Sequence, residues 1–184
     1  MANKVKARVM DASKIRRILY RMATEIIERN RDLKSLVIVG IRTRGIYIGK
    51  RIAKIIKEME KVDIPVGVMD ITLYRDDFSE HEPQHTVQKT EIKFSIAKKN
   101  VLLVDDVLFT GRTIRAAMDG LFDIGRPKSI QLLVLIDRGH RELPIRADYV
   151  GKNLPTSRRE IVQVQLKEID DKDEVLIVEP VELK

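Results

Sequence analysis

Along this chain, segments in which hydrophobic side chains recur with helical spacing alternate with short, continuous hydrophobic runs. From Asp11 to Arg31 hydrophobic side chains recur every three or four residues, as on one face of an amphipathic helix, and Asp11 or Ser13 can cap its start. The same spacing returns at Ile46–Lys57 and at Arg112–Phe122. We therefore predict three helices, the first with a buried face made of Ile15, Ile18, Leu19, Met22, Ala23, Ile26 and Ile27.

Short runs rich in β-branched residues lie between these helices. They predict buried strands at Leu36–Gly40, Val66–Leu73, Val101–Val104 and Ile130–Ile136. Strands that alternate with helices predict an α/β fold with a mostly parallel, doubly wound sheet flanked by helices. After Asp137 the pattern is irregular, and further strands are expected near Asp148–Val150, Ile161–Leu166 and Glu174–Glu179.

The stretch from Tyr74 to Lys99 interrupts this order. It is polar, contains Pro83 and alternates only weakly around Thr86–Phe94. A long irregular insertion in a compact domain is often functional, so we expect an extended hairpin or flap here. With 184 residues and no linker or repeat, the chain is expected to form one domain over residues 1–184.

Composition narrows the class of protein. Hydrophobic residues make up 43% and charged residues 34%, as in a soluble globular protein. No apolar run is long enough to span a bilayer or serve as a signal peptide, so we expect no membrane partner and a cytoplasmic location. The absence of cysteine excludes disulfides, zinc–thiolate sites and a cysteine nucleophile, and three histidines make a histidine-rich metal site improbable.

The net charge of +7 is unevenly distributed. Residues 1–34 carry ten basic and four acidic side chains, and residues 138–159 carry six and two. Residues 160–184 carry three basic and eight acidic side chains. Two basic segments on a nearly neutral body indicate a polyanionic partner, and solvated surface faces are the alternative explanation.

The segment Val101–Thr113, VLLVDDVLFTGRT, holds the most specific chemistry. Asp105 and Asp106 follow an apolar strand, where they can accept hydrogen bonds from ribose hydroxyls, directly or through Mg²⁺. The turn at Phe109–Thr113 opens a helix, whose free amides and dipole favour phosphate, and Gly111 lets the backbone approach the anion. The alternative is that the acids only end the strand and cap the helix.

This segment resembles the signature with which type I phosphoribosyltransferases bind phosphoribosyl pyrophosphate (PRPP). It is neither a Walker A loop nor a dinucleotide fingerprint. The resemblance implies that Gly40-Ile-Arg-Thr-Arg-Gly45 is the pyrophosphate loop, with Arg44 acting in catalysis beside Asp105 and Asp106. The residues implied to bind PRPP or the nucleotide are Thr43, Arg44, Gly45, Asp105, Asp106, Val107, Leu108, Phe109, Thr110, Gly111, Arg112 and Thr113.

Three further segments narrow the resemblance. They are DRGHRELPIRADYVGKN at Asp137–Asn153, DITLYRDD at Asp70–Asp77 and ERN at Glu28–Asn30. Together they closely resemble the pyrimidine-operon attenuation regulators, which are also uracil phosphoribosyltransferases, from about Val9 to Leu166. The resemblance implies a Mg²⁺-dependent reaction in which uracil and PRPP give UMP and pyrophosphate.

The same resemblance implies roles for the outer parts of the fold. A small hood, within residues 137–184, would cover uracil through Arg138, with Val162 as an apolar neighbour. A flap at about residues 74–99 would close over PRPP with Arg75. Mg²⁺ would be bound through PRPP and possibly by Asp105 and Asp106.

The family also binds the leader of pyrimidine messenger RNA, and its UMP-bound form stops transcription. The resemblance therefore implies RNA binding at Arg29, Arg141, Arg146 and Lys152, for which surface or intersubunit salt bridges are the alternative. The family usually carries Thr and His on the first helix, where this chain has Tyr20 and Thr24. That difference bears on RNA specificity and leaves the PRPP segment unchanged.

Two other functions remain open on the sequence. One is a phosphoribosyltransferase for another base without RNA regulation, and the other is a nucleotide sensor without turnover. We also expect a homodimer or homotetramer, by resemblance.

Overall fold

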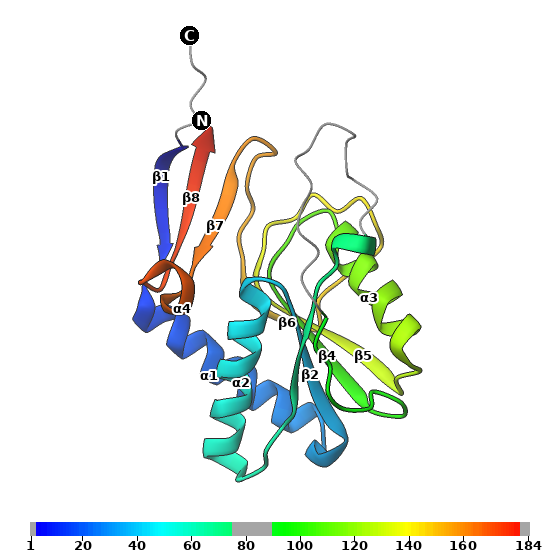
Figure 1. The fold of residues 1–184 in the computed structure, drawn as a ribbon. Helices are drawn as coiled ribbons and strands as arrows, with labels where there is room; N and C mark the ends of the chain where they lie inside the picture. The colour runs from blue at the N-terminus through cyan, green and yellow to red at the C-terminus, as the bar shows by residue number, and fades with distance from the viewer. Residues whose placement is uncertain (1–2, 75–89, 181–184) are drawn as a thin grey trace.

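A computed structural model describes residues 3–74 and 90–180 of the chain. Its larger sheet has five parallel strands in the order β3-β2-β4-β5-β6 (Figure 1). The strands are β2 (Leu36–Ile41), β3 (Val66–Met69), β4 (Asn100–Leu108), β5 (Ser129–Asp137) and β6 (Tyr149–Asn153). The predicted parallel α/β sheet is confirmed.

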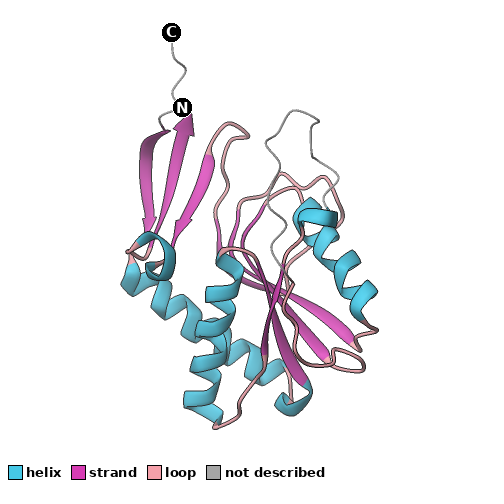
Figure 2. Ribbon diagram, viewed as in Figure 1, coloured by secondary structure: helices cyan, strands magenta, loops and turns pink. Residues whose placement is uncertain are grey.

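Three helices cover the two faces of this sheet (Figure 2). They are α1 (Ala12–Arg29), α2 (Arg44–Glu60) and α3 (Arg112–Ile124). Helices α1 and α2 pack on one face and α3 on the other, so each face has its own hydrophobic core. At the start of α1 the Asp11 carboxylate accepts a hydrogen bond from the Lys14 amide at 2.8 Å, one of the two caps that the sequence allowed.

A second, antiparallel sheet lies beside the first, in the order β1-β8-β7. Its strands are β1 (Asn3–Met10), β7 (Ile161–Gln165) and β8 (Glu174–Pro180), and α4 (Lys167–Asp170) lies between the last two. Strand β1 was not predicted. Met10, Val162 and Val175 of this sheet join the core formed by α1 and α2, so one core runs beneath both sheets.

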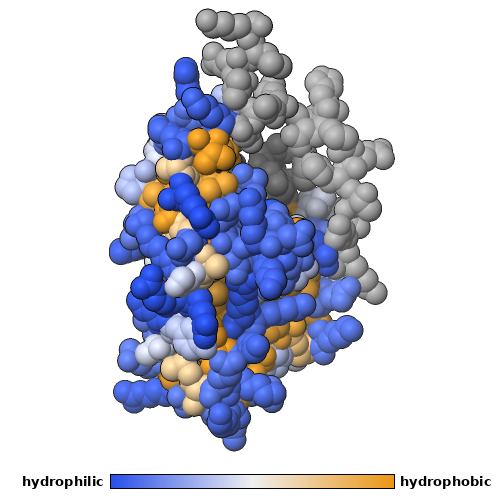
Figure 3. All heavy atoms as spheres, turned by 90° about the vertical axis from the view of Figure 1, so that its left-hand side faces the viewer, coloured by the Kyte–Doolittle hydropathy of each residue, from blue (hydrophilic) through white to orange (hydrophobic). Residues whose placement is uncertain are grey.

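The outer face of the small sheet carries hydrophobic side chains. Figure 3 shows hydrophobic side chains gathered toward one end of this view, with smaller hydrophobic patches farther along a largely hydrophilic surface. Val5 on β1 and Ile161 on β7 are both exposed.

Two predicted elements differ from the structure. The strand predicted at Val66–Leu73 ends at Met69, and a 3-10 turn (η2, Thr72–Tyr74) follows. The Asp70 carboxylate causes this break, because it accepts a hydrogen bond from the Thr72 amide at 2.9 Å and folds the chain into a turn. Most of the predicted flap, residues 75–89, lies outside the described residues. Beyond it, Glu91 pairs with Val68 as an isolated bridge.

Candidate active site

Strand β4 places two acidic side chains at the centre of the larger sheet. We expected the strand to end at Val104, but it continues to Leu108, because Val107 and Leu108 pair with Ile136 and Asp137 of β5. Asp105 and Asp106 therefore lie within β4 rather than after it. The Asp105 carboxylate accepts a hydrogen bond from the Asp106 amide at 2.9 Å. The Asp106 carboxylate accepts one from the Val107 amide at 3.0 Å.

The two carboxylates are costly to keep charged. Burial raises the pKa of Asp105 well above its ordinary value, and the neighbouring charge of Asp106 raises it further. Burial also raises the pKa of Asp106, although the hydrogen bond with Asp105 and the nearby charge of Arg44 act in the opposite direction. A cation or hydroxyl donors beside the pair would relieve this cost.

The chain turns sharply after β4 and enters α3. Gly111, at φ 96°, occupies the left-handed region that favours glycine, and α3 begins at Arg112. The Thr110 hydroxyl accepts a hydrogen bond from the Arg112 amide at 3.3 Å. A pocket of about 370 Å³ lies at this turn, lined by Val107, Leu108, Phe109, Thr110, Gly111, Arg112, Thr113, Ile114 and Glu142. The helix amino terminus at such a pocket favours a phosphate group.

The loop after β5 covers this turn and holds it in place. The Thr110 carbonyl accepts hydrogen bonds from the amides of Glu142 and Leu143, at 2.9 and 3.2 Å. Arg141 donates to the carbonyl of Phe109 at 2.7 Å and to that of Ile145 at 3.0 Å.

Arg141 also pairs with the carboxylate of Asp137. Its guanidinium is therefore bonded within the site, a position that the sequence does not indicate, and its predicted contact with RNA stays a prediction. The Arg-Gly-His-Arg run alone does not indicate which arginine turns inward.

The predicted pyrophosphate loop joins β2 to α2 beside the acidic strand. A Cβ on Gly45 would lie 2.2 Å from the Val104 carbonyl oxygen, so only glycine lets α2 start this close to β4. Thr43 precedes α2 without capping it through its side chain, and the Arg42–Thr43 peptide bond is cis. Arg44 lies near enough to Asp106 for its charge to lower the pKa of that carboxyl. It also donates to Asp170 of α4 at 2.9 Å.

Arg138 lies at the base of the predicted hood. It is buried, with its guanidinium carbon 4.1 Å from the centre of the Phe109 ring. It donates to the Thr156 hydroxyl at 3.0 Å and to the Ser157 carbonyl at 2.8 Å. Burial lowers the pKa of Arg138.

A hollow of about 440 Å³ beside Arg138 is lined by Asp137, Arg138, Gly139, His140, Arg141, Asn153, Leu154, Pro155 and Thr156. Val162 lies on β7, where it is buried in the core below both sheets. Arg75, predicted to act in the flap, lies outside the described residues.

The other predicted RNA-binding residues lie on or near α1 and β6. Arg29 forms an ion pair with Asp148, with 3.1 Å between Nη2 and Oδ1. Its guanidinium carbon lies over the Tyr149 ring, 5.6 Å from the ring centre. Arg146 is exposed, and Lys152 is partly exposed on β6. Arg21 of α1 donates to two carbonyls of β6, which fixes the helix along this strand.

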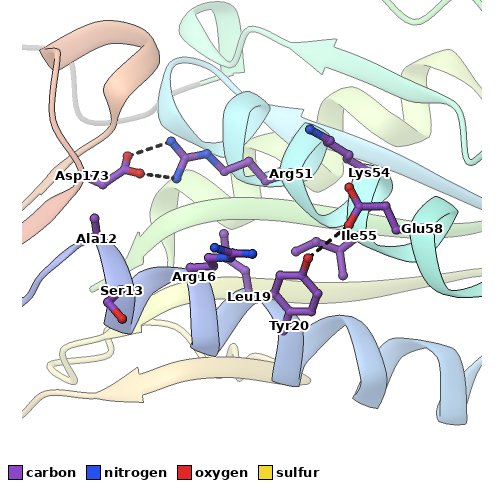
Figure 4. A pocket seen from close by; sticks show the side chains of 10 residues that line it. All are labelled: Ala12, Ser13, Arg16, Leu19, Tyr20, Arg51, Lys54, Ile55, Glu58 and Asp173. Carbon is purple, nitrogen blue, oxygen red and sulfur yellow. Dashed lines mark hydrogen bonds and ion pairs between the residues drawn. The ribbon is translucent and has the colours of Figure 1, made fainter.

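Tyr20 does not face the side of α1 that packs on β6. It lines a groove of about 530 Å³ between α1 and α2 (Figure 4). Its hydroxyl donates to Glu58 of α2 at 3.1 Å. At the other end of the groove, Arg51 binds Asp173 through two hydrogen bonds. It also binds Glu168, so α2 is joined to the segment between β7 and β8, a connection that no local pattern in the sequence indicates.

Among residues 3–74 and 90–180 no group of three or more histidine, cysteine or acidic side chains could hold a metal ion. Within the same residues, no helix has the length and apolar character that crossing a membrane requires.

Comparison with known proteins agrees with this geometry. The model of the phosphoribosyl transferase domain family matches residues 8–169. The chain is 54% identical to a Bifunctional protein PyrR from Deinococcus radiodurans over 97% of this chain and 98% of that protein. It is 58% identical to a Bifunctional protein PyrR from Pelotomaculum thermopropionicum over 96% and 98%.

Solved structures show the same fold at low sequence identity. The hypoxanthine phosphoribosyltransferase of Trypanosoma cruzi aligns with a TM-score of 0.74 at 18% identity, over 96% of this chain and 98% of that one. That of Staphylococcus aureus aligns with a TM-score of 0.73 at 23% identity, over 96% and 92%.

Proposed function

This chain belongs to the phosphoribosyl transferase domain family and, within it, to the family of the bifunctional PyrR proteins, and from this premise we propose two linked activities. The first is a uracil phosphoribosyltransferase that converts uracil and PRPP into UMP and pyrophosphate. The second is UMP-dependent binding of pyrimidine leader messenger RNA, which attenuates transcription.

One observation supports the first activity: three parts of a PRPP site, namely the acidic pair, the turn at Gly111 and the loop ending at Gly45, meet at the carboxyl ends of β2 and β4. The acidic pair of β4 suits ribose hydroxyls, and the turn at Gly111 suits a 5′-phosphate. The loop ending at Gly45 packs directly on Val104 and brings Arg44 toward Asp106. In open α/β sheets, ligands usually bind at the edge formed by the carboxyl ends of the parallel strands.

In the proposed reaction, N1 of uracil attacks C1′ of PRPP while the bond from C1′ to pyrophosphate breaks. The uracil N1 proton is lost, and the bonding electrons leave with pyrophosphate. Asp105 and Asp106 hold the ribose hydroxyls, and amides near Thr110 hold the 5′-phosphate. Arg44 stabilises charge on the leaving group, and the hollow beside Arg138 takes uracil. Catalysis then depends on positioning and electrostatics rather than on a protein nucleophile.

The residues present fit a Mg²⁺ ion that arrives with PRPP. The buried carboxylate of Asp105 and the partly exposed carboxylate of Asp106, both with raised pKa values, supply oxygen ligands and gain from a nearby cation. Because the described residues offer no third acidic or histidine ligand there, phosphate oxygens and water would complete the coordination. When bound, Mg²⁺ would neutralise charge on the departing pyrophosphate.

The exposed cations near α1 and β6 support the second activity. Arg146 is exposed and Lys152 is partly exposed there, and Arg29 is exposed while it pairs with Asp148. Arg141 bonds to Phe109 and Ile145, so it can also hold the PRPP turn, and its contact with RNA stays a prediction. A homodimer or homotetramer and a cytoplasmic location stay predictions.

Two measurements test the proposal. Purified protein is assayed for PRPP-dependent conversion of uracil, hypoxanthine and guanine, and we expect turnover of uracil. Turnover of a purine without uracil would refute the assigned substrate. Binding to a labelled pyrimidine-leader stem-loop is then measured with and without UMP. An affinity that UMP does not change would refute the regulatory half.

A further inference from the structure

Three loops that are distant in sequence meet at the amino-terminal edge of the five-stranded sheet. They are residues 29–35 before β2, 97–100 before β4 and 125–129 before β5. The Lys98 amide donates to the Arg126 carbonyl at 3.0 Å, and the Lys128 amide donates to the Lys99 carbonyl at 2.8 Å. The Lys99 ammonium donates to the Lys34 carbonyl at 3.2 Å. The three loops therefore form one surface, which we call the basic edge.

The charge of the basic edge is strongly one-sided. Within the three loops the single acidic side chain is Asp32, and the seven cations are Arg29, Arg31, Lys34, Lys98, Lys99, Arg126 and Lys128; Arg29 also pairs with Asp148, which lies outside the loops. Seven positive charges and one negative charge give a formal charge of +6, which is most of the +7 of the whole chain. A concentration of one sign on one surface creates a potential that attracts polyanions.

Two groups of side-chain hydrogen bonds join the segments that carry these cations. Asn30 and Gln131 bond side chain to side chain at 3.1 Å, and the Tyr149 hydroxyl donates to Gln131 at 2.9 Å. The Asn100 amide group donates to the Ser35 hydroxyl at 3.3 Å and its oxygen accepts from Ser129 at 2.9 Å. The loops are thus tied to one another before any ligand arrives.

The hollow beside these side chains selects the class of ligand. It measures about 560 Å³ and is lined by Arg29, Asn30, Arg31, Asp32, Ser35, Lys98, Asn100, Lys128 and Gln131. All of these side chains are polar or charged and none is aromatic, so the lining offers no ring on which a base could stack. Such a lining suits a phosphate backbone better than a free nucleoside.

We propose that the basic edge binds the phosphate backbone of RNA. The inference rests on the RNA-binding half of the proposed function and adds a contact surface to it. Arg29 belongs both to the predicted RNA surface and to this hollow, so a strand that lies along α1 continues onto the basic edge. The PRPP pocket lies at the opposite, carboxyl-terminal edge of the strands, so both ligands can be bound together.

The test removes two cations and keeps the fold. Lys98 holds a left-handed backbone conformation at φ 60°, which glycine adopts more readily, so Lys98→Gly removes a charge and relieves backbone strain. Lys128→Ala removes a second exposed cation and keeps the backbone amide that bonds Lys99. The matched control is Lys61→Gly, because Lys61 has φ 59°, is exposed and lies outside the three loops.

Dissociation constants of full-length wild-type and variant proteins are measured over a salt series with two labelled probes, the pyrimidine-leader stem-loop and poly(U). For the Lys98→Gly/Lys128→Ala protein we expect the slope of log affinity against log salt to become smaller with both probes, by about 0.7 to 1 unit per cation. Uracil turnover should stay at the wild-type value, and Lys61→Gly should keep the wild-type slope.

The outcomes separate this inference from the proposed function. If wild-type protein binds both probes and the double variant keeps its slope, the inference is wrong. If wild-type protein binds both probes equally and UMP changes neither, the regulatory function is wrong, and a smaller slope in the double variant still supports the basic edge. If wild-type protein binds neither probe, both proposals fail.

Discussion

Replacing Arg51 with methionine should measure how strongly α2 is joined to the segment between β7 and β8. The guanidinium donates to both Glu168 oxygens, at 2.9 and 2.6 Å, and to both Asp173 oxygens, at 3.0 and 2.7 Å. Methionine keeps the length of the aliphatic stem, so mainly the charge and these four hydrogen bonds are lost. Two carboxylates that face each other then remain without their cation.

The size of the effect follows from burial. Hydrogen bonds to charged groups contribute about 1.5–3 kcal/mol in protected sites, and exposed ion pairs contribute less than about 1 kcal/mol. The side chains of Asp173 and Glu168 are 19% and 35% exposed. The contribution of each of the two ion pairs with Arg51 should therefore lie between these limits. We therefore expect Arg51→Met to lower the free energy of unfolding by about 2–3 kcal/mol near neutral pH.

The loss should depend on pH with a defined sign. The hydrogen bond from Arg51 lowers the pKa of Glu168. Burial alone would raise the pKa of Asp173, but hydrogen bonds from Arg51 and the Lys167 amide bring it below its ordinary value. Stability from such carboxylates is present above their unfolded pKa values of about 4 and disappears as the pH falls through the folded values. The difference between wild type and variant should therefore shrink below about pH 4.

Urea unfolding followed by circular dichroism, at neutral pH and at about pH 3, measures both effects. Lys57→Met is the control, since Lys57 and Asp63 form an ion pair with side chains 60% and 78% exposed, and its removal should change stability by less than about 0.5 kcal/mol. The reasoning fails if Arg51→Met costs no more than this control, or if its effect is the same at both pH values.

Three further predictions concern the active site. Gly45→Ala would place a Cβ 2.2 Å from the Val104 carbonyl, so we expect a loss of about 1–3 kcal/mol in urea unfolding and a raised KM for PRPP; an unchanged KM would contradict close packing of this loop on β4. Asp106→Asn should lower uracil turnover roughly a hundredfold. The variant should keep or raise the midpoint of urea unfolding, because burial penalises the charged form of the Asp106 carboxylate. A variant that unfolds at lower urea would contradict this penalty. Phe109→Leu removes the ring beneath Arg138, which should cost about 1–2 kcal/mol and raise the KM for uracil; neither change would be expected if the stacking only fills space.

The sequence was most informative where a local pattern and a buried position coincide. The parallel sheet and its three main helices followed from periodicity, because their apolar faces are continuous in sequence. The PRPP segment was recognisable because Asp105, Asp106 and Gly111 are unusual residues at fixed spacing after an apolar strand. The length of β4 was not predictable in the same way, since β5 extends the strand past the acids by pairing with Leu108.

Features that depend on distant partners were missed. Strand β1 exposes Lys4, Lys6 and Arg8 and becomes a strand through its pairing with β8. The inward position of Arg141 depends on the carbonyl of Phe109, 32 residues earlier. The basic edge also depends on the fold, because each of its loops carries only two or three cations and the sheet assembles them.

The pairing of β1 with β8 also sets an order of events during protein synthesis. Lys6 of β1 bonds Glu179 of β8, 173 residues later in the chain. The five-stranded sheet is complete by Asn153, so the PRPP edge can form on the ribosome while β1 still waits for its partner. The lysines of β1 would discourage nascent chains from pairing with this unprotected edge during the delay. The pairing of β1 with β8 is therefore expected to be among the last steps of folding.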